Sequence, residues 1–237
     1  MSRLAALRTY VLKANTELVH RGLVPFVFGN ASGISREDGL VVIKPSGVPY
    51  DRLTAAGMVV TDLDGHVVDS ELRPSTDLPT HLALYRAIPG IGGVVHTHSR
   101  FACVWAQAGR EIPCLGTTHA DYFRGPVPVT APMTPDEIQT AYEWNIGEVI
   151  VRRMASLDPV EIPGVLVWGH GPFCWGASPA DAAHIAAVIE ELARMAYYTM
   201  MLNPAVGPLD PVLLDRHFLR KHGPSAYYGQ KTRTGHP

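Results

Sequence analysis

The sequence has few cysteines, no long apolar run and no excess of charge of either sign. Its 237 residues include only Cys103, Cys114 and Cys174, with no C-x-x-C spacing, which argues against a disulfide framework and against a cysteine-based zinc site. We expect all three to be buried as small apolar residues. A net charge of −2 gives no global field that favours nucleic acid or an anionic membrane. The bulk composition is that of a compact soluble protein.

Targeting and nucleotide-binding signals are missing as well. Arg8, Lys13 and Glu17 interrupt the apolar positions of the N-terminal segment, so it does not read as a signal peptide. No apolar run approaches the roughly 18 residues that cross a bilayer. Neither a nucleotide P-loop nor a dinucleotide-binding glycine fingerprint occurs. We therefore expect a cytoplasmic protein with no nicotinamide cofactor.

Short apolar runs alternate with helical patterns along the chain. Helices are predicted over about 3–20 and 180–202, with Thr134 and Ser178 as N-caps of two helices. Asp64-Gly65 predicts a hairpin with a type I′ turn. Strands are predicted at 23–28, 40–43, 58–60, 66–68, 92–97, 126–129, 164–168 and 172–175. Hairpins mixed with helices favour an α/β fold in which helices cover a mainly antiparallel sheet.

The stretch "GGVVHTHSRF" ends a predicted strand with two histidines two residues apart. Alternation along a strand sends His96 and His98 to one face, with Cα atoms roughly 6.6 Å apart, while Thr97 faces the opposite way into the packing. The pair is either two core histidines or half of a metal site, and spacing alone leaves both interpretations open. His170, between Gly169 and Gly171 at a strand end, is the best candidate for a third ligand. Three imidazoles with at most one carboxylate suit Zn²⁺ with an open position for substrate.

Three short polar segments could bind an anion through backbone N–H groups and small polar side chains. They are "GNASG" (29–33), "KPSG" (44–47) and "PSTD" (74–77), which we interpret as turns. Lys44 adds a charge suited to phosphate. Each segment alone is more typical of a plain turn than of an anion site. Asp121 in "GTTHADYFRG" and the tyrosines Tyr227 and Tyr228 in "AYYGQ" are candidates for acid/base chemistry, or for a helix cap and for packing of the chain end.

Six segments together resemble the class II aldolase family, and within it the sugar-phosphate epimerases. They are "GNASG", "IKPSGV", "PSTDLPTHLALYRAIPGIGGVVHTHS", "AQAGREIPCLGTTHADYF", "GVLVWGHGPFCWG" and "LRKHGPSAYYGQ". The resemblance covers about residues 3 to 230. It implies one domain over 1–230, with residues 231–237 as a disordered tail, and a three-layer α/β fold with a mostly antiparallel sheet of about nine strands. It also implies a homotetramer with fourfold (C4) symmetry and active sites between subunits.

The resemblance assigns a role to individual residues. It implies Zn²⁺, with Mn²⁺ or Co²⁺ as alternatives, bound by His96, His98, His170 and Asp77. The other implied residues are a phosphate pocket of Asn30, Lys44, Ser46, Gly47, Ser75 and Thr76, an acid/base pair of Asp121 and Tyr228 on opposite sides of the substrate, and supporting residues Thr117, Glu143 and His217. Tyr228 would come from the neighbouring subunit.

The implied activity is epimerisation of a pentulose 5-phosphate at C4, from L-ribulose 5-phosphate to D-xylulose 5-phosphate, by cleavage and re-formation of the C3–C4 bond. Two acid/base groups are needed because the proton leaves on one face and returns on the other. An aldolase of the same family would release the aldehyde instead, although such aldolases usually carry Glu where this chain has Asp77. Two further interpretations stay open: L-xylulose 5-phosphate as the substrate, or a non-catalytic domain that resembles the adducin head.

Overall fold

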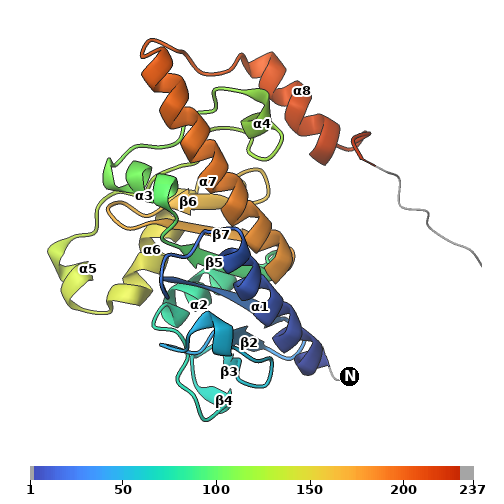
Figure 1. The fold of residues 1–237 in the computed structure, drawn as a ribbon, viewed down its shortest axis with the longest axis vertical. Coiled ribbons are helices and arrows are strands. Elements are labelled where there is room, and N and C mark those ends of the chain that lie inside the picture. Colours follow the sequence, from blue (N-terminus) through green and yellow to red (C-terminus); the bar gives the residue numbers. More distant parts are fainter. Residues whose placement is uncertain (1–2, 230–237) are drawn as a thin grey trace, which may run out of the picture.

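The computed structural model describes residues 3–229, which are built around a seven-stranded antiparallel sheet (Figure 1). The strands are β1 (Gly29–Ser35), β2 (Leu40–Ile43), β3 (Val59–Asp62), β4 (Val67–Asp69), β5 (Gly93–Thr97), β6 (Gly164–Leu166) and β7 (Pro172–Gly176), in the order β4-β3-β2-β1-β5-β7-β6. Every pairing between neighbours is antiparallel. The predicted antiparallel sheet is confirmed, but the predicted count of about nine strands exceeds the seven found within the described residues.

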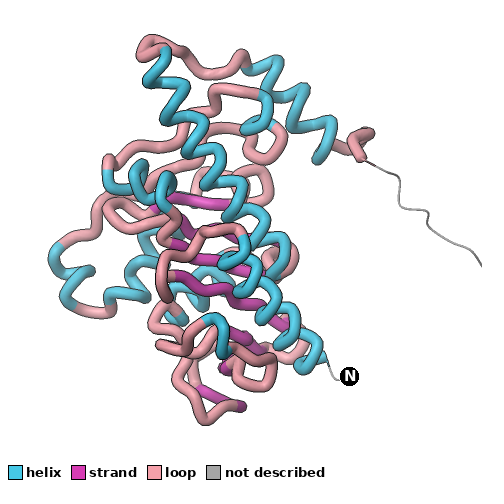
Figure 2. The backbone as a smooth tube through the Cα atoms, in the orientation of Figure 1, coloured by secondary structure: helices cyan, strands magenta, loops and turns pink. Residues whose placement is uncertain are grey.

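Helices cover both faces of the sheet (Figures 1 and 2). They are α1 (Arg3–His20), α2 (Leu78–Ala87), α3 (Arg100–Gln107), α4 (Thr117–Ala120), α5 (Pro135–Gln139), α6 (Tyr142–Met154), α7 (Pro179–Leu202) and α8 (Pro211–His222), with a 3-10 turn η1 (Tyr50–Arg52). Successive residues of β1 show the two layers. A Cβ on Gly33 would meet Leu7 of α1 and Pro179 of α7, whereas Ser32 contacts His81 of α2 on the opposite face.

Two predicted strands are wrong, and proline explains both. Residues 23–28 form no strand, and the chain turns at Pro25 before β1 begins at Gly29. Residues 126–129 make only isolated bridges, Ile112 with Val127 and Val129 with Leu166. Pro126 and Pro128 lack the N–H groups that a continuous ladder needs. The apolar composition of these two segments therefore predicted strands where the backbone cannot form a continuous ladder of hydrogen bonds.

Predictions from local motifs at turns and helix N-termini were more accurate than the predictions of these two strands. The hairpin between β3 and β4 is confirmed, but only Gly65 of its central pair has a positive φ (+88°), so the turn is not type I′. Thr134 forms a capping box with Glu137, and Ser178 caps α7, as predicted. The predicted tail, 231–237, lies outside the described residues, and the single domain stays a prediction. Across residues 3–229, no helix has both the length and the apolar character to cross a membrane.

Candidate metal and anion site

The segment "GNASG", predicted as a turn, lies in the central strand β1. Its residues are small because helices approach closely on one side: a Cβ on Gly33 would come within 2.7 Å of Pro179 Cγ. On the other face, Asn30 pairs in register with His96 of β5. Asn30 is 2 % exposed, so the antiparallel ladder fixes an amide directly beside the first predicted metal ligand. The segment contributes to the site through a strand side chain and not through turn backbone.

The three predicted histidines converge. His96 is in β5, His98 follows its last residue, and His170 lies in the turn between β6 and β7. One ring nitrogen from each lies within 4.8 Å of the other two, and His98 Nε2 is 3.1 Å from His170 Nε2. Gly171 permits the approach, because a Cβ there would lie 2.7 Å from the Thr97 carbonyl oxygen. Thr97 itself is buried, which agrees with its predicted place in the packing.

The donor set fits a divalent metal ion of borderline softness. Pro172 O lies 3.0 Å from His96 Nδ1, which fixes Nδ1 as the protonated nitrogen and leaves Nε2 with a free lone pair. Phe173 stacks on the same ring at 4.2 Å and holds its plane. Burial, with the neighbouring imidazoles, keeps the pKa values of His96 and His170 below the usual range, so both rings are neutral donors. Burial also lowers the pKa of His98. Three convergent neutral imidazoles are a typical Zn²⁺ ligand set.

Asp77 lies beside the histidines but does not join their group. It lines the same cavity, yet its carboxylate is not within 4.8 Å of all three ring nitrogens. Asn30 Nδ2 donates to Asp77 Oδ2 at 2.5 Å and to Ser75 Oγ at 3.1 Å. One amide therefore joins the carboxylate to the polar segment 74–77, and the role of Asp77 as a metal ligand stays a prediction.

The anion segments meet the histidines at one cavity of about 270 Å³. It is lined by Val27, Phe28, Gly29, Asn30, Lys44, Pro45, Ser46, Gly47, Ser75, Thr76, Asp77, His96 and His98. All six predicted phosphate residues are among them. Lys44 is 3 % exposed, and no carboxylate among residues 3–229 pairs with it. Burial lowers the Lys44 pKa. A buried ammonium without a carboxylate partner favours an anionic ligand.

Two aromatic residues were not predicted from the sequence: one lines this cavity and the other contacts Lys44. Phe28 packs against His98 with ring centroids 5.8 Å apart, and Tyr50 lies under the Lys44 ammonium at 4.9 Å while donating to the Gly29 carbonyl at 2.7 Å. Phe28 belonged to the wrongly predicted strand 23–28, so its exposure was not foreseen. Tyr50 comes three residues after "KPSG", and only the fold shows that it returns to the site.

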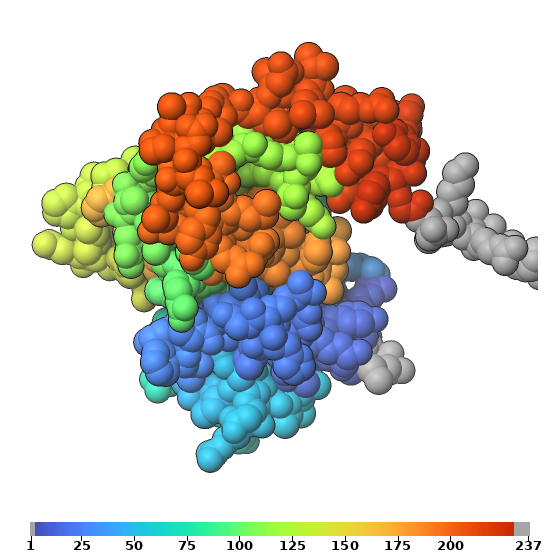
Figure 3. All heavy atoms as spheres, turned by 45° about the horizontal axis from the view of Figure 1, so that its top comes forward, coloured from blue at the N-terminus to red at the C-terminus, as the bar shows by residue number. Residues whose placement is uncertain are grey.

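The Asp121 region forms a second cluster, away from this cavity. Asp121 follows α4 and faces α8, where Arg220 donates to both carboxylate oxygens, His217 Nδ1 lies 3.0 Å away and Lys221 Nζ 3.3 Å away. Partial burial alone would raise the pKa of Asp121, but the hydrogen bonds from Arg220 and His217 and the charge of Lys221 outweigh it and lower this pKa. None of these residues lines the histidine cavity. Figures 1 and 3 show α4 and α8 packed together at one end of the molecule.

Tyr228 belongs to the same cluster. Arg220 and Lys221 lie 4.9 and 4.5 Å from its ring centroid, so Asp121 and Tyr228 share both cations within one chain. Thr117 begins α4, and its carbonyl accepts from the Asp121 backbone N–H. Glu143, in contrast, lies in the first turn of α6, where its carbonyl accepts from Thr80 Oγ1. The basic run "LRKH" carried the signal for Arg220 and Lys221, which the sequence reasoning missed.

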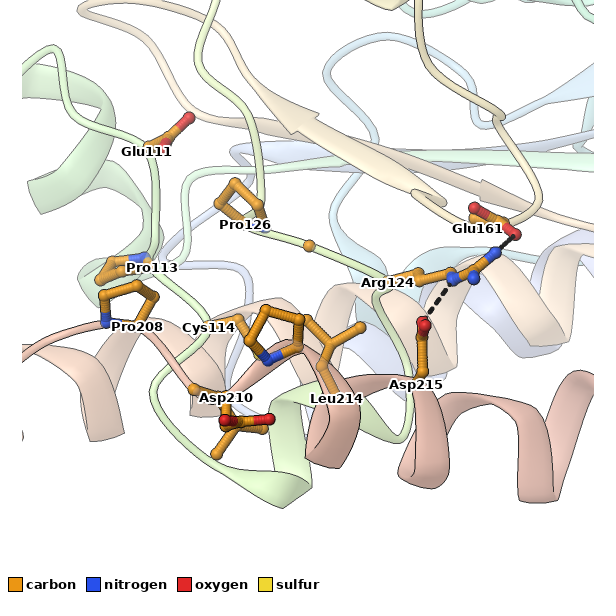
Figure 4. A pocket seen from close by; sticks show the side chains of 13 residues that line it. Glu111, Pro113, Cys114, Arg124, Pro126, Glu161, Pro208, Asp210, Leu214 and Asp215 are labelled. Atoms are coloured by element: carbon orange, nitrogen blue, oxygen red, sulfur yellow. Dashed lines mark hydrogen bonds and ion pairs between the residues drawn. The ribbon is translucent and has the colours of Figure 1, made fainter.

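A larger cavity, of about 560 Å³, has none of the predicted site residues in its wall (Figure 4). Prolines and acidic side chains line it. Its one cation, Arg124, is satisfied by Glu161 at 2.7 Å and Asp215 at 2.8 Å. Because that charge is already paired, nothing in this wall matches the unpaired ammonium and free imidazole nitrogens of the smaller cavity.

Comparison with known proteins places the chain among sugar-phosphate enzymes. It is 54% identical over 225 residues to the L-ribulose-5-phosphate 4-epimerase UlaF of Salmonella paratyphi B, covering 95% of this chain and 99% of that protein. An L-fuculose 1-phosphate aldolase shares the fold with a TM-score of 0.76 and 23% identity, over 92% of this chain and 95% of the other.

A second solved aldolase structure and a family model also match this chain. The L-fuculose-1-phosphate aldolase of Thermus thermophilus has a TM-score of 0.66 and 25% identity, over 85% of this chain and 99% of its own. The model described as "Class II Aldolase and Adducin N-terminal domain" matches residues 9–197. On this evidence, the chain belongs to the class II aldolase and adducin N-terminal domain family.

Proposed function

We propose that this protein is a metal-dependent epimerase that converts L-ribulose 5-phosphate to D-xylulose 5-phosphate. The observation that carries the proposal is one cavity lined by His96 and His98, on which His170 converges, beside a buried lysine that pairs with no carboxylate within residues 3–229. That pairing suits a substrate with chelating oxygens at one end and a phosphate at the other. The similarity to the Salmonella epimerase selects this activity within the family.

Each part of the cavity has a separate task. His96, His98 and His170 would hold the metal ion, with Asp77 as a further ligand, and Zn²⁺ is the ion that this donor set favours. A divalent ion bound there supplies Lewis-acid stabilisation of the negative charge that develops when the C3–C4 bond breaks. Lys44, with the hydroxyls and backbone of its neighbours, holds the phosphate. That hold keeps the aldehyde fragment in place while it turns its other face.

Asp121 and Tyr228 would perform the proton transfers. The cations around Asp121 keep its carboxylate ionised, which suits a base that takes the C4 hydroxyl proton. The Tyr228 hydroxyl would exchange a proton on the opposite face, so that re-addition inverts C4. Because this cluster and the cavity lie apart within one chain, we propose that a neighbouring subunit brings both residues to the substrate.

The surface of α8 supports such an assembly. Phe218 is its single buried residue, while Val212, Leu213 and Leu219 are 79, 40 and 42 % exposed. Amphipathic helices normally bury their apolar stripe. A C4 homotetramer would cover these side chains and complete each active site across an interface. We place this enzyme in the cytoplasm.

The proposal is tested by incubating the Zn²⁺- or Mn²⁺-loaded protein with L-ribulose 5-phosphate and following the formation of D-xylulose 5-phosphate. Tyr228→Phe is expected to lower turnover by about 10²–10⁴-fold and to leave the metal content unchanged. Loss of metal in that variant would contradict the assigned role of the tyrosine. Aldehyde release without epimerisation would indicate an aldolase, and absence of stoichiometric metal would favour a non-catalytic domain.

A further inference from the structure

A fully buried polar network of Ser32, His81 and Tyr85 joins β1 to α2 and contains none of the residues that line the cavity. Ser32 Oγ is 2.7 Å from His81 Nδ1 and 2.8 Å from the Tyr85 hydroxyl. None of the three residues is exposed. Burying three polar side chains is costly unless every donor and acceptor is paired. Each donor and acceptor of Ser32, His81 and Tyr85 therefore needs a hydrogen-bond partner.

The hydrogen bonds in this network can be donated in only one order, from Tyr85 to Ser32 and from Ser32 to His81. The Tyr85 phenol carries one proton and needs an acceptor for it. Among the described residues, Ser32 Oγ is the one acceptor left for the phenol proton. Ser32 must then give its own single proton to His81 Nδ1. The His81 ring is thereby the neutral form protonated at Nε2, and that N–H is a donor.

The partner of this donor follows from the geometry of β1 and α2. Asn30 and Ser32 project from the same face of β1, two residues apart, and Asp77 and His81 are one helical turn apart at the start of α2. Asn30 binds Asp77, and Ser32 binds His81, so the four side chains form two parallel rungs. Each rung leaves one buried atom without a partner within residues 3–229: Asn30 Oδ1, an acceptor, and His81 Nε2, a donor.

We propose that His81 is a positioning residue for the anion and metal site, acting through one buried water that accepts from His81 Nε2 and donates to Asn30 Oδ1. Such a water satisfies both unpaired atoms, as buried waters commonly do. It also fixes the orientation of the Asn30 amide. With Oδ1 turned inward, Nδ2 must face Asp77 and Ser75. Without this bridge the amide can flip, which would set an oxygen against the Asp77 carboxylate and release Ser75 from the phosphate cradle.

The test uses the zinc-loaded protein and two readouts, the ¹⁵N shifts of the histidine rings and the dissociation constant of inorganic phosphate. Wild-type His81 should show a protonated Nε2 and an unprotonated Nδ1. His81→Leu removes the donor and should weaken phosphate binding about tenfold. His81→Gln keeps an N–H donor near the position of Nε2, and it should restore phosphate affinity to within about threefold of wild type.

Tyr85→Phe is the matched control, because it removes a buried hydroxyl from the same network yet leaves Ser32 free to donate to His81. It should lower the melting temperature and leave phosphate affinity unchanged. A wild-type ring protonated at Nδ1, or His81→Leu protein that binds phosphate like wild type, would overturn the proposal. If His81→Leu does not fold, the wild-type ring shifts and the affinity of His81→Gln still decide. The inference rests on the proposed anion site, but neither readout requires epimerisation, so failure of the activity is distinguishable from failure of this network.

Discussion

The histidine cavity and the Asp121 cluster are built in different ways. In the cavity, His96 is 1 % exposed and is held by strand register, a stacked Phe173 and a hydrogen bond to Pro172. In the cluster, Tyr228 is 61 % exposed, and the positions depend on long charged side chains of one helix. The residues of the cavity all come from one chain, whereas the cluster keeps its charged side chains 13–25 % exposed and turns the Tyr228 ring outward. This difference supports the proposal that the cavity of one subunit binds the substrate and that a neighbouring subunit supplies the acid/base residues.

Removing a histidine should have the largest effect. We expect His98→Asn to lose bound metal and to lower activity by more than about a hundredfold, because loss of a residue that only orients a metal ligand already costs about 10–100-fold. Metal analysis of the purified variant, beside a steady-state assay, checks this. His20→Asn is the matched control, since His20 is exposed at the end of α1. Retention of full metal by the His98 variant would contradict the ligand assignment.

Lys44→Met should weaken the anion end of the same cavity. The charge-assisted hydrogen bonds of a phosphate to lysine are expected to contribute about 1.5–3 kcal/mol, so KM should rise about tenfold or more. Metal content should not change. Inhibition by inorganic phosphate, measured for the wild type and for Lys44→Met, tests whether Lys44 binds the phosphate. An unchanged phosphate inhibition constant would place the anion elsewhere.

Arg220→Gln tests the role of the Asp121 cluster through the pH dependence of kcat/KM. Arg220 helps to hold the Asp121 pKa below its usual value, so removing the guanidinium should raise that pKa and move the acid limb of kcat/KM to higher pH. The same contact stabilises the folded protein above the unfolded pKa of the carboxyl, and this contribution disappears as pH falls through the lower folded pKa. Arg152→Gln, which breaks an exposed ion pair with Glu137, should leave the acid limb in place. An unshifted limb in Arg220→Gln would mean that Asp121 is not the base.

The smallest effect belongs to a change outside both regions. Thr134→Ala removes the capping box of α5 and should cost about 1 kcal/mol of stability. Thermal or urea unfolding measures this loss. Activity and metal content should be unchanged, because α5 contributes no side chain to the cavity or the cluster. A fall in kcat of Thr134→Ala would show that α5 affects the active site and not only the stability of the fold.

Local chemistry in the sequence predicted more of the site than long-range geometry did. The i, i+2 spacing placed His96 and His98 on one face, and the flanking glycines placed His170 at a strand end, because both depend on backbone rules of a few residues. "GNASG" was read as a turn, since small polar residues are typical of turns. Its burial depends on α1 and also on α7, which comes from a distant part of the chain.

The cluster shows the complementary limit. The resemblance pointed to Asp121, His217 and Tyr228, but no local pattern placed Arg220 and Lys221 between Asp121 and the tyrosine. That arrangement needs α8 to pack against α4, about 100 residues earlier in the chain. The placement of Asp121 and Tyr228 on opposite sides of one substrate stays a prediction, because within one chain the two residues share the same two cations. Pairing between chains is not encoded in any local pattern.

Hetero-oligomers of two disabled variants test whether the cavity of one subunit works with the cluster of its neighbour. His98→Asn disables the cavity and Tyr228→Phe disables the cluster, so each homo-oligomer should be nearly inactive. When the two variants are co-expressed with different tags and isolated as hetero-oligomers, about a quarter of the interfaces should join an intact cavity to an intact cluster. A site shared between subunits therefore predicts that activity returns to about that fraction of wild type. Hetero-oligomers no more active than the separate variants would contradict it and place both halves of the site in one chain.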